Sequence, residues 1–416
     1  MVDVKSGYKQ TEIGVIPDDW SLLNLGKSAI LKARIGWQGL TTNEYLKTGD
    51  YCLVTGTDFV NGYIDWDNCV FVEKERYIQD KFIQVKPNDI LVTKDGTIGK
   101  VAFVEKVDKP TTLNSGVFVL RPLNNSFSPK YLYHILMSEY FKVFLGKLTA
   151  GSTISHLYQK DFVHYSFPLP PTKEEQQAIA NALSDMDALI TNLDTLIAKK
   201  KAIKKGAMQQ LLTPPSKGGK RLPGFSGEWV EKSLGEVARY KNGTAHEQCV
   251  VKSGDYIIVN SKFVSTEGRV KKYSKSILNP VKKNDILMVL SDVPNGKAIA
   301  KCFYVNVNNK YTLNQRICAI TSELEFIDSK FLFLILNRNP YFLGFDDGAK
   351  QTNLRNEDVL KCPLNIPKSV IEQQKISQII FDMDTELEAL EAKKEKYSQL
   401  KQGMAQELLT GKTRLV

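Results

Sequence analysis

Few combinations of residues in this sequence are arranged for catalysis. The segment Gly411-Lys412-Thr413 has the last three residues of a phosphate-binding loop, but Gln406 stands where such a loop needs a glycine. The segment also lies in a C-terminal tail instead of following a strand, so we interpret it as the end of a helix. Glu391-Ala392-Lys393 lies on an exposed helical stretch, where side chains two residues apart do not converge on a metal.

Metal and nucleophile patterns are missing as well. The four histidines have no ligand spacing, and the six cysteines form no Cys-x-x-Cys pair, so buried free thiols are the better interpretation. The sequence contains no Asn-Pro-Pro-Tyr or Asp-Pro-Pro-Tyr motif of amino-methyltransferases, no Gly-x-Ser-x-Gly and no His-Glu-x-x-His. We therefore expect a binding and scaffolding protein that is not an enzyme and holds no cofactor or metal itself.

Charge favours a polyanionic partner. The 416 residues include 56 Lys and Arg against 46 Asp and Glu, a formal net charge of +10. No run of eighteen apolar residues occurs, and the N-terminal residues do not resemble a signal peptide. We expect a soluble, cytoplasmic chain with no membrane partner.

One long helix is present twice. Glu174-Glu175-Gln176-Gln177 begins a stretch that aligns without a gap with the stretch beginning at Glu372-Gln373-Gln374, and each follows a proline-bearing apolar segment. The linker at 214–224 contains prolines, glycines and cations, which end the first copy and give a flexible connection. We predict a globular domain at 1–170, a long helix at 171–213, a linker with a second globular domain at 214–366, and a C-terminal long helix at 367–416.

Apolar residues in both helices recur at heptad spacing. The predicted seam consists of Ile179, Leu183, Met186, Ile190, Leu193, Ile197, Ile376, Ile380, Met383, Leu387 and Leu390. About 39 residues per helix give a rod of roughly 60 Å. We predict an antiparallel coiled coil that places the globular domains at opposite ends with pseudo-twofold symmetry. Lysines interrupt the seam, and they form either a solvated face or a surface for a partner: Lys200, Lys204, Lys394 and Lys401.

The globular domains repeat the same order of short segments. Alternating apolar residues separated by Gly and Asn-Asp turns predict a largely antiparallel sheet, as in 85–92 and its copy 281–288. A helix follows in each domain, with capping residues at Ser128 and Asp328. The fold class is therefore mixed α/β, of the α+β kind, with two domains each followed by a long helix.

This ordered set resembles the specificity subunit of type I restriction–modification systems, over nearly the whole chain. The resemblance depends on the segments 8–17, 88–100 and Gly151-Ser152-Thr153, and most specifically on Pro168-Leu169-Pro170-Pro171 followed by Glu175-Gln176-Gln177. It implies two target recognition domains, each specific for one half of a bipartite double-stranded DNA site, and helices that set the spacer. It also implies two methyltransferase subunits docked on the helices, with restriction subunits in a full system. S-adenosylmethionine, ATP and magnesium would belong to those partners.

The polar loops of the two domains differ, which indicates that the two half-sites differ and the target is asymmetric. We expect DNA contacts on these loops, where Lys and Arg neutralise phosphates and Asn, Gln and Arg have the geometry to contact base edges. We interpret the glycines Gly96, Gly99 and Gly151 as turn formers. The candidate residues are Lys94, Thr97, Lys100, Ser152, Thr153 and His156, with Arg34, Trp37 and Gln38, in the first domain, and Asn295, Lys297, Lys350, Gln351, Asn353 and Arg355, with Arg239 and Lys241, in the second.

Two other functions stay open, and a third is disfavoured. The chain could be a structural adaptor with an incidental basic charge, or an orphan specificity subunit that directs methylation only. A fused restriction–methylation enzyme is disfavoured by the missing methyltransferase motif. The sequence does not give the DNA site or the spacer length.

Overall fold

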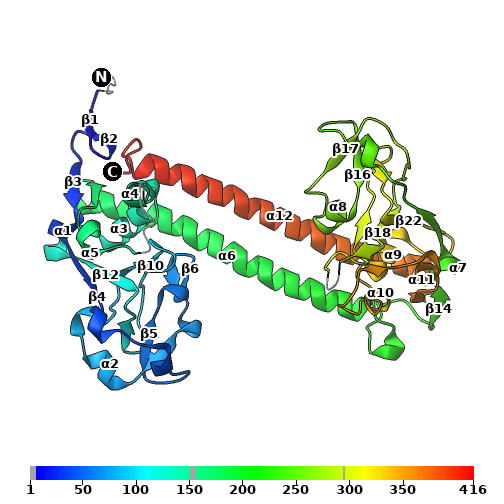
Figure 1. Ribbon diagram of the computed structural model, residues 1–416, viewed down its shortest axis with the longest axis horizontal. Coiled ribbons are helices and arrows are strands. Elements are labelled where there is room, and N and C mark those ends of the chain that lie inside the picture. The colour runs from blue at the N-terminus through cyan, green and yellow to red at the C-terminus, as the bar shows by residue number, and fades with distance from the viewer. Residues whose placement is uncertain (1–5, 150–155, 294–295) are drawn as a thin grey trace. The chain divides into compact units, whose positions relative to one another are not determined.

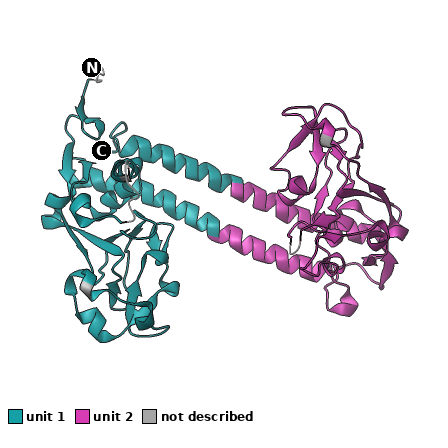
Figure 2. Cartoon of the chain, in the orientation of Figure 1, with its two compact units in different colours: residues 1–194, 392–416 teal, residues 195–391 magenta. Residues whose placement is uncertain are grey.

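The computed structural model describes residues 6–149, 156–293 and 296–416 (Figure 1). The chain forms two compact units, residues 1–194 with 392–416 and residues 195–391 (Figure 2). Each unit contains one globular domain and a part of both long helices, α6 (Lys173–Leu211) and α12 (Val370–Leu408). The Ser152–Thr153 and Asn295 predictions, and Gly151, lie outside the described residues.

The first globular domain consists of short strands interleaved with short helices. Its strands are β1 (Tyr8–Thr11), β2 (Gly14–Pro17), β3 (Ser21–Asn24), β4 (Ala29–Ala33), β5 (Tyr51–Val54), β6 (Phe59–Val60), β7 (Tyr63–Ile64), β8 (Val70–Val72), β9 (Ile90–Thr93), β10 (Val101–Phe103), β11 (Thr111–Leu113), β12 (Val117–Pro122) and β13 (Ser166–Leu169). Its helices are α1 (Leu25–Ser28), α2 (Lys74–Ile78), α3 (Pro129–Leu136), α4 (Glu139–Thr149) and α5 (Gln159–Phe162).

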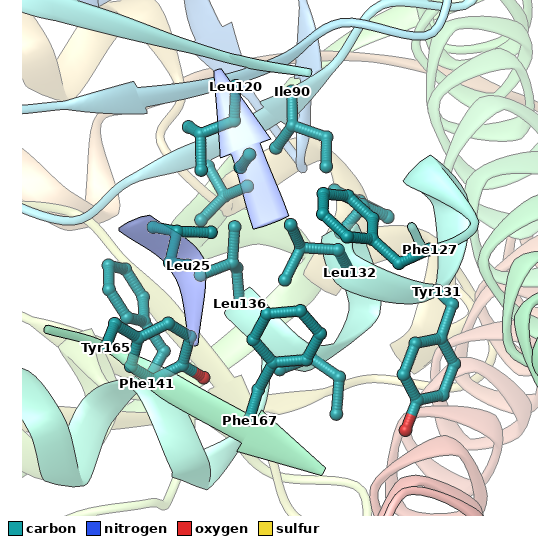
Figure 3. Packing of buried hydrophobic residues seen from close by; sticks show 14 of the residues in the cluster. Leu25, Ile90, Leu120, Phe127, Tyr131, Leu132, Leu136, Phe141, Tyr165 and Phe167 are labelled. Atoms are coloured by element: carbon teal, nitrogen blue, oxygen red, sulfur yellow. The ribbon is translucent and has the colours of Figure 1, made fainter. Parts of the chain in front are cut away.

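The sheets of this domain are mainly antiparallel, as predicted. The largest has the order β4-β12-β9-β10-β7-β6, and a second has the order β11-β5-β8. Two pairs depart from the prediction because β11 runs parallel to β5 and β10 runs parallel to β7. Figure 3 shows the core between the large sheet and α3, where Ile90 and Leu120 face Leu132 and Leu136. Phe167 of β13 closes this core next to the start of α6.

The second globular domain repeats the plan. Its strands are β14 (Trp229–Ser233), β15 (Ala238–Asn242), β16 (Tyr256–Val259), β17 (Lys272–Ser274), β18 (Ile286–Val289), β19 (Ser291–Asp292), β20 (Cys302–Tyr304), β21 (Tyr311–Leu313), β22 (Ile317–Ser322), β23 (Thr352–Asn353) and β24 (Pro363–Pro367). Its helices are α7 (Leu234–Val237), α8 (Ser261–Ser265), α9 (Ser329–Leu336), α10 (Pro340–Leu343) and α11 (Asn356–Leu360). The main sheet has the order β15-β22-β18-β20, and β16 runs parallel to β21 as β5 does to β11.

Within each unit the two long helices lie side by side and antiparallel, which confirms the predicted pairing. Most of the predicted seam is buried, including Ile179, Leu183, Ile376 and Ile380, whereas Ile190, Met383 and Leu390 are half-buried. In the first unit the end of α12 joins the core of the first domain, since Leu408 packs in the same cluster as Ile179 and Leu183. The helix pair is therefore part of each domain's hydrophobic core.

A buried glutamine near the start of each long helix holds that helix to its own domain. The Gln176 side-chain oxygen accepts a hydrogen bond from the Ser128 backbone N–H at 2.8 Å, and Gln373 accepts one from Asp328 at 2.8 Å. Each glutamine amide also donates to the carbonyl six residues before it, at 3.2 and 2.8 Å. Ser128 and Asp328 are the N-cap residues of α3 and α9, so these bonds join the long helix to the domain helix.

The glutamate before each glutamine is buried and makes an ion pair with an arginine nearer the surface. Glu175 of α6 pairs with Arg414, which follows α12, with Nη2 2.7 Å from Oε2. Glu372 of α12 pairs with Arg221, which follows α6, also at 2.7 Å. Arg414 additionally contacts Asp19 at 3.0 Å. Each pair therefore ties the beginning of one long helix to the segment after the end of the other.

Candidate DNA-binding surfaces

Three segments that are distant in sequence meet at one edge of the first domain. The Lys94 backbone N–H donates to the Gly116 carbonyl at 2.8 Å, and the Leu157 N–H donates to the Lys94 carbonyl at 2.8 Å. Next to this ladder the His156 ring contacts the Asp95 carboxylate, and the two residues form a β-bridge. The predicted residues Lys94 and His156 are therefore brought together by the fold.

The second domain builds the same arrangement with other side chains. The Leu290 N–H donates to the Arg316 carbonyl at 3.0 Å, and the Leu354 N–H donates to the Leu290 carbonyl at 2.8 Å. The ladder continues as β19 and β23, where Ser291 pairs with Asn353. Gln351 donates from Nε2 to the Ser291 hydroxyl at 2.7 Å, so two predicted residues, Gln351 and Asn353, belong to this surface.

The loop after β9 in the first domain is closed by its own backbone contacts. The Thr93 hydroxyl donates to the Thr97 carbonyl at 2.5 Å and accepts from the Lys100 N–H at 2.9 Å. Gly96 and Gly99 have φ of +68° and +78°, which supports their interpretation as turn formers. The side chains of Thr97 and Lys100 are exposed at this loop, which leaves both available to a ligand.

The second predicted loop of the first domain is different, and Arg34 requires a correction. Its side chain is only 1% exposed, and the guanidinium donates from Nε to the Leu113 carbonyl at 2.9 Å and from Nη2 to the Thr112 hydroxyl at 3.0 Å. Arg34 is thus a structural residue of the interior, because its donors are used within the domain. Gln38 is also buried, and Trp37 lies in the 3-10 helix of residues 36–38.

The remaining candidates of the second domain lie at the surface. Arg239 forms an ion pair with Glu323, and Lys241 donates from Nζ to the Pro280 carbonyl at 2.7 Å, so both cations already have partners. Lys297, Lys350 and Arg355 are exposed. Arg316 was not identified as a candidate from the sequence. When Thr312-Leu313-Asn314 is aligned with Thr112-Leu113-Asn114, Arg316 is the residue that corresponds to Gly116.

The lysines that interrupt the helix seam have partners that were not foreseen. Each forms an ion pair with an acidic residue of the other long helix, within one unit: Lys200 with Glu386 at 2.7 Å, Lys394 with Asp194 at 2.5 Å, Lys204 with Asp384, and Lys401 with Asp187. Neither a solvated face nor a free partner surface describes these side chains, because their charges are neutralised across the helix pair.

A cavity of about 980 Å³ lies in the first unit between the β1–β2 hairpin, α4 and the last turns of α12. Its walls are mostly apolar, with Tyr140, Val143 and Ala405, and Lys401 lines it beside its ion pair. His134 also lines the cavity; burial lowers the pKa of this imidazole to about 3, and its Nε2 lies 3.0 Å from the Ser184 hydroxyl. The described residues contain no cluster of three or more His, Cys, Asp or Glu that could hold a metal ion.

No helix among residues 6–149, 156–293 and 296–416 is both long and apolar enough to cross a membrane.

Comparisons with known proteins identify the repeated domain. The model of the type I restriction modification DNA specificity domain matches residues 37–204 and 226–401. The chain is 27% identical over 432 residues to the type I restriction enzyme MjaVIII specificity subunit of Methanocaldococcus jannaschii, covering 96% of this chain and 94% of the relative.

More distant similarities agree. The chain is 22% identical over 298 residues to the type I restriction enzyme StySPI specificity subunit of Salmonella potsdam, covering 67% of this chain and 62% of that protein. The crystal structure of the type I restriction–modification S subunit from M. genitalium matches with a TM-score of 0.63 and 18% identity, over 94% of this chain and 96% of the other. The two matches of the domain model together cover most of the chain. The chain therefore belongs to the type I restriction modification DNA specificity family.

Proposed function

We propose that this chain is the DNA specificity subunit of a type I restriction–modification complex, in which each globular domain recognises one half of a bipartite, asymmetric site. One observation carries the proposal. The fold assembles the same three segments at the same place in both domains, yet the side chains there differ: Lys94 corresponds to Leu290 and His156 to Asn353.

A constant backbone with variable side chains fits sequence recognition. Base edges in the major groove are distinguished by donors and acceptors on side chains, whereas phosphate contacts hold a protein in register without specifying bases. Gln351 and Asn353 have the amide geometry for adenine, and the exposed Lys100, Lys297 and Lys350 suit phosphates. Because the two surfaces differ, the two half-sites differ.

The long helices suit a role in setting the spacer. Each is a continuous helix of 39 residues, so it extends roughly 60 Å. Within both units the helices are paired through apolar and ion-pair contacts, and glutamines 176 and 373 fix them to the domains. Such pairing resists bending, and the helix pair therefore suits a rod that limits which spacers the two domains accept.

The helix pair is also the proposed docking surface for two methyltransferase subunits. The apolar cavity beside α4 and α12 is a recess on this surface in the first unit. In this assignment the chain is not catalytic. The methyltransferase subunits supply S-adenosylmethionine, and restriction subunits, where present, supply ATP and magnesium chemistry.

Methylome sequencing of cells with and without this chain, expressed with its methyltransferase subunit, tests the function. We expect methylated adenines in two different half-sites separated by a fixed spacer, present only with the chain. A methylome that does not change on deletion would contradict the proposal and favour a structural adaptor. Restriction of unmodified DNA in the same cells separates a full system from one that only methylates.

Insertion of one heptad into both α6 and α12, at the level of the Lys394–Asp194 ion pair, tests the spacer role. Seven residues add about 10 Å of helix, or about 3 base pairs, while the seam repeat is preserved. The accepted spacer should lengthen by that amount with unchanged half-sites. A matched control inserts the heptad into α12 alone, which should disrupt pairing and abolish methylation. An unchanged spacer with the double insertion would contradict the rod geometry.

A further inference from the structure

One pair of facing residues, here called a rung, carries a cation in both domains but in different segments of the chain. In the first domain Lys94 pairs with Gly116 across the strands, whereas in the second Leu290 pairs with Arg316. Each rung thus contains one cation, but the cation is the residue directly after β9 in one domain and the residue directly before β22 in the other. The charge is kept while its position in the sequence changes.

The correspondence of these rungs follows from the surrounding contacts. The Val117 N–H donates to the Asn114 carbonyl at 3.3 Å, and the Ile317 N–H donates to the Asn314 carbonyl at 3.0 Å, so both rungs border the same tight turn. On the other side the Leu157 and Leu354 amides donate to the carbonyls of Lys94 and Leu290. The rung is therefore bracketed by the same turn and the same third segment in both domains.

The two cations lie at the same end of the paired strands in their domains, next to Thr93–Val117 in the first and Val289–Ile317 in the second. Lys94 Nζ lies 5.7 Å from the centre of the Phe118 ring, and Phe118, the second residue of β12, follows Gly116 by two positions. In the second domain Arg316 is two residues before Cys318, which packs in the same cluster as Leu290. Arg316 and Gly116 are the last residues of equivalent turns before β22 and β12, so Arg316 stands where the partner of Lys94 stands in the first domain.

Arg316 is free to bind. The residue is exposed, and within residues 6–149, 156–293 and 296–416 its guanidinium makes no hydrogen bond or ion pair. Two other arginines of the second domain are engaged, since Arg239 pairs with Glu323 and Arg338 donates to the Ile299 carbonyl at 3.0 Å. The backbone under Arg316 is held in place, because its carbonyl accepts from Leu290 and Gly243 approaches Asn314 too closely for a Cβ.

We infer that this pair of positions places a DNA-binding cation in each domain, and that Arg316 recognises a guanine in the half-site of the second domain. The inference rests on the proposed function and names a residue for it. A guanidinium donates two parallel hydrogen bonds to O6 and N7 of guanine, whereas an ammonium makes a less selective contact. Lys94 accordingly supplies affinity in the first half-site, and Arg316 supplies base discrimination in the second.

The test uses the full chain assembled with its methyltransferase subunit, and DNA libraries randomised at one half-site at a time. Arg316→Ala should lower the preference for one guanine in the second half-site by about 5- to 150-fold. Arg316→Lys keeps the charge, so it should retain most of the affinity and still lose the preference. Arg269→Ala, which removes another exposed guanidinium of the same domain, is the matched control and should leave the preference unchanged.

The first half-site serves as an internal control, because its preference should be the same in every variant. If the wild-type complex methylates a bipartite site and Arg316→Ala leaves all base preferences intact, the inference is wrong while the function stands. If the wild-type complex has no base preference in either half-site, the proposed function itself is wrong. Equal thermal unfolding of wild type and variant excludes misfolding as the cause.

Discussion

Lys401 on α12 forms an ion pair with Asp187 on α6, and the same relationship recurs between Lys204 on α6 and Asp384 on α12. Lys401 and Lys204 occupy equivalent positions of the repeated helix, as do Asp187 and Asp384, with an offset of 197 residues in both cases. A polar contact placed within an apolar seam specifies which residues of two helices face each other. We therefore assign these pairs to the register of the helices.

The first prediction concerns this register. Lys401→Ala leaves the Asp187 carboxylate, whose side chain is 17% exposed, without its cation and should lower the free energy of unfolding by about 1–3 kcal/mol. Asp187→Ala with Lys401→Ala should cost less than the sum of the single changes, as measured by urea denaturation. Lys396→Ala, at an exposed position of the same helix, is the control. Strictly additive effects would show that the pair contributes no coupling.

The second prediction concerns the glutamine that joins α6 to the first domain. Gln176→Leu leaves the Ser128 N–H without its acceptor in a buried site and should cost about 1–3 kcal/mol. Hydrogen exchange of the Ser128 amide should become faster than in the wild type. Gln177→Leu changes the exposed neighbour and should leave this amide protected. Unchanged Ser128 exchange in Gln176→Leu would contradict the contact.

The third prediction concerns pH. Burial lowers the pKa of His134 to about 3 from an unfolded value near 6.5. Between these values the unfolded state binds a proton that the folded state does not, so the free energy of unfolding falls as pH decreases, by up to about 1.4 kcal/mol per pH unit. His134→Leu should weaken this acid dependence below pH 6.5. Leucine suits the site because Leu334 occupies the equivalent position of α9.

An unchanged pH slope in His134→Leu would show that other groups dominate the acid response. The control is His164→Leu, since this residue also lines the cavity and lies outside α3. Thermal unfolding measured at intervals between pH 4 and pH 8 would compare the three chains at constant ionic strength.

The fourth prediction concerns two exposed cations of the second domain. Lys350→Ala should weaken DNA binding evenly across sequences and reduce the salt dependence by about one phosphate contact. Arg355→Ala should weaken binding as well, and it should relax the choice of the second half-site if Arg355 contacts a base. Lys361→Ala removes an exposed lysine that pairs with Glu357 at 3.5 Å and should have no effect. If both variants keep the wild-type affinity and methylation pattern, Lys350 and Arg355 are not part of the DNA-binding surface.

The duplicated elements could be predicted from the sequence because each weak local pattern occurs in both copies, and the second occurrence supports the interpretation of the first. The helices Lys173–Leu211 and Val370–Leu408 lie within the predicted ranges, and proline and glycine signals limited their ends. The parallel pairing of β5 with β11 was not predicted, because residue alternation fixes which face is buried and does not fix strand direction. The meeting of Lys94 with His156 needed the tertiary structure as well.

Individual polar residues were harder to assign than elements. Arg34 and an exposed arginine have the same sequence signal. The burial of Arg34 is explained by its acceptors in the fold, which are the Leu113 and Arg76 carbonyls, the Thr112 hydroxyl and the Gln79 side-chain oxygen. The corresponding Thr312 hydroxyl instead contacts His246 Nε2 at 2.7 Å. The buried threonine hydroxyl is thus hydrogen-bonded in both domains, by an arginine in one and a histidine in the other. A polar side chain in a loop therefore does not predict a ligand contact until its internal partners are known.

The division of the chain also affects how it is made. The second unit, residues 195–391, is continuous in sequence, whereas the first needs residues 392–416 as well. During synthesis the first domain emerges earlier but lacks Leu408 and the arginine partner of Glu175 until the second unit has been translated. The first unit thus completes its core last, and a ribosome that stalls within α12 leaves the earlier-made domain unfinished.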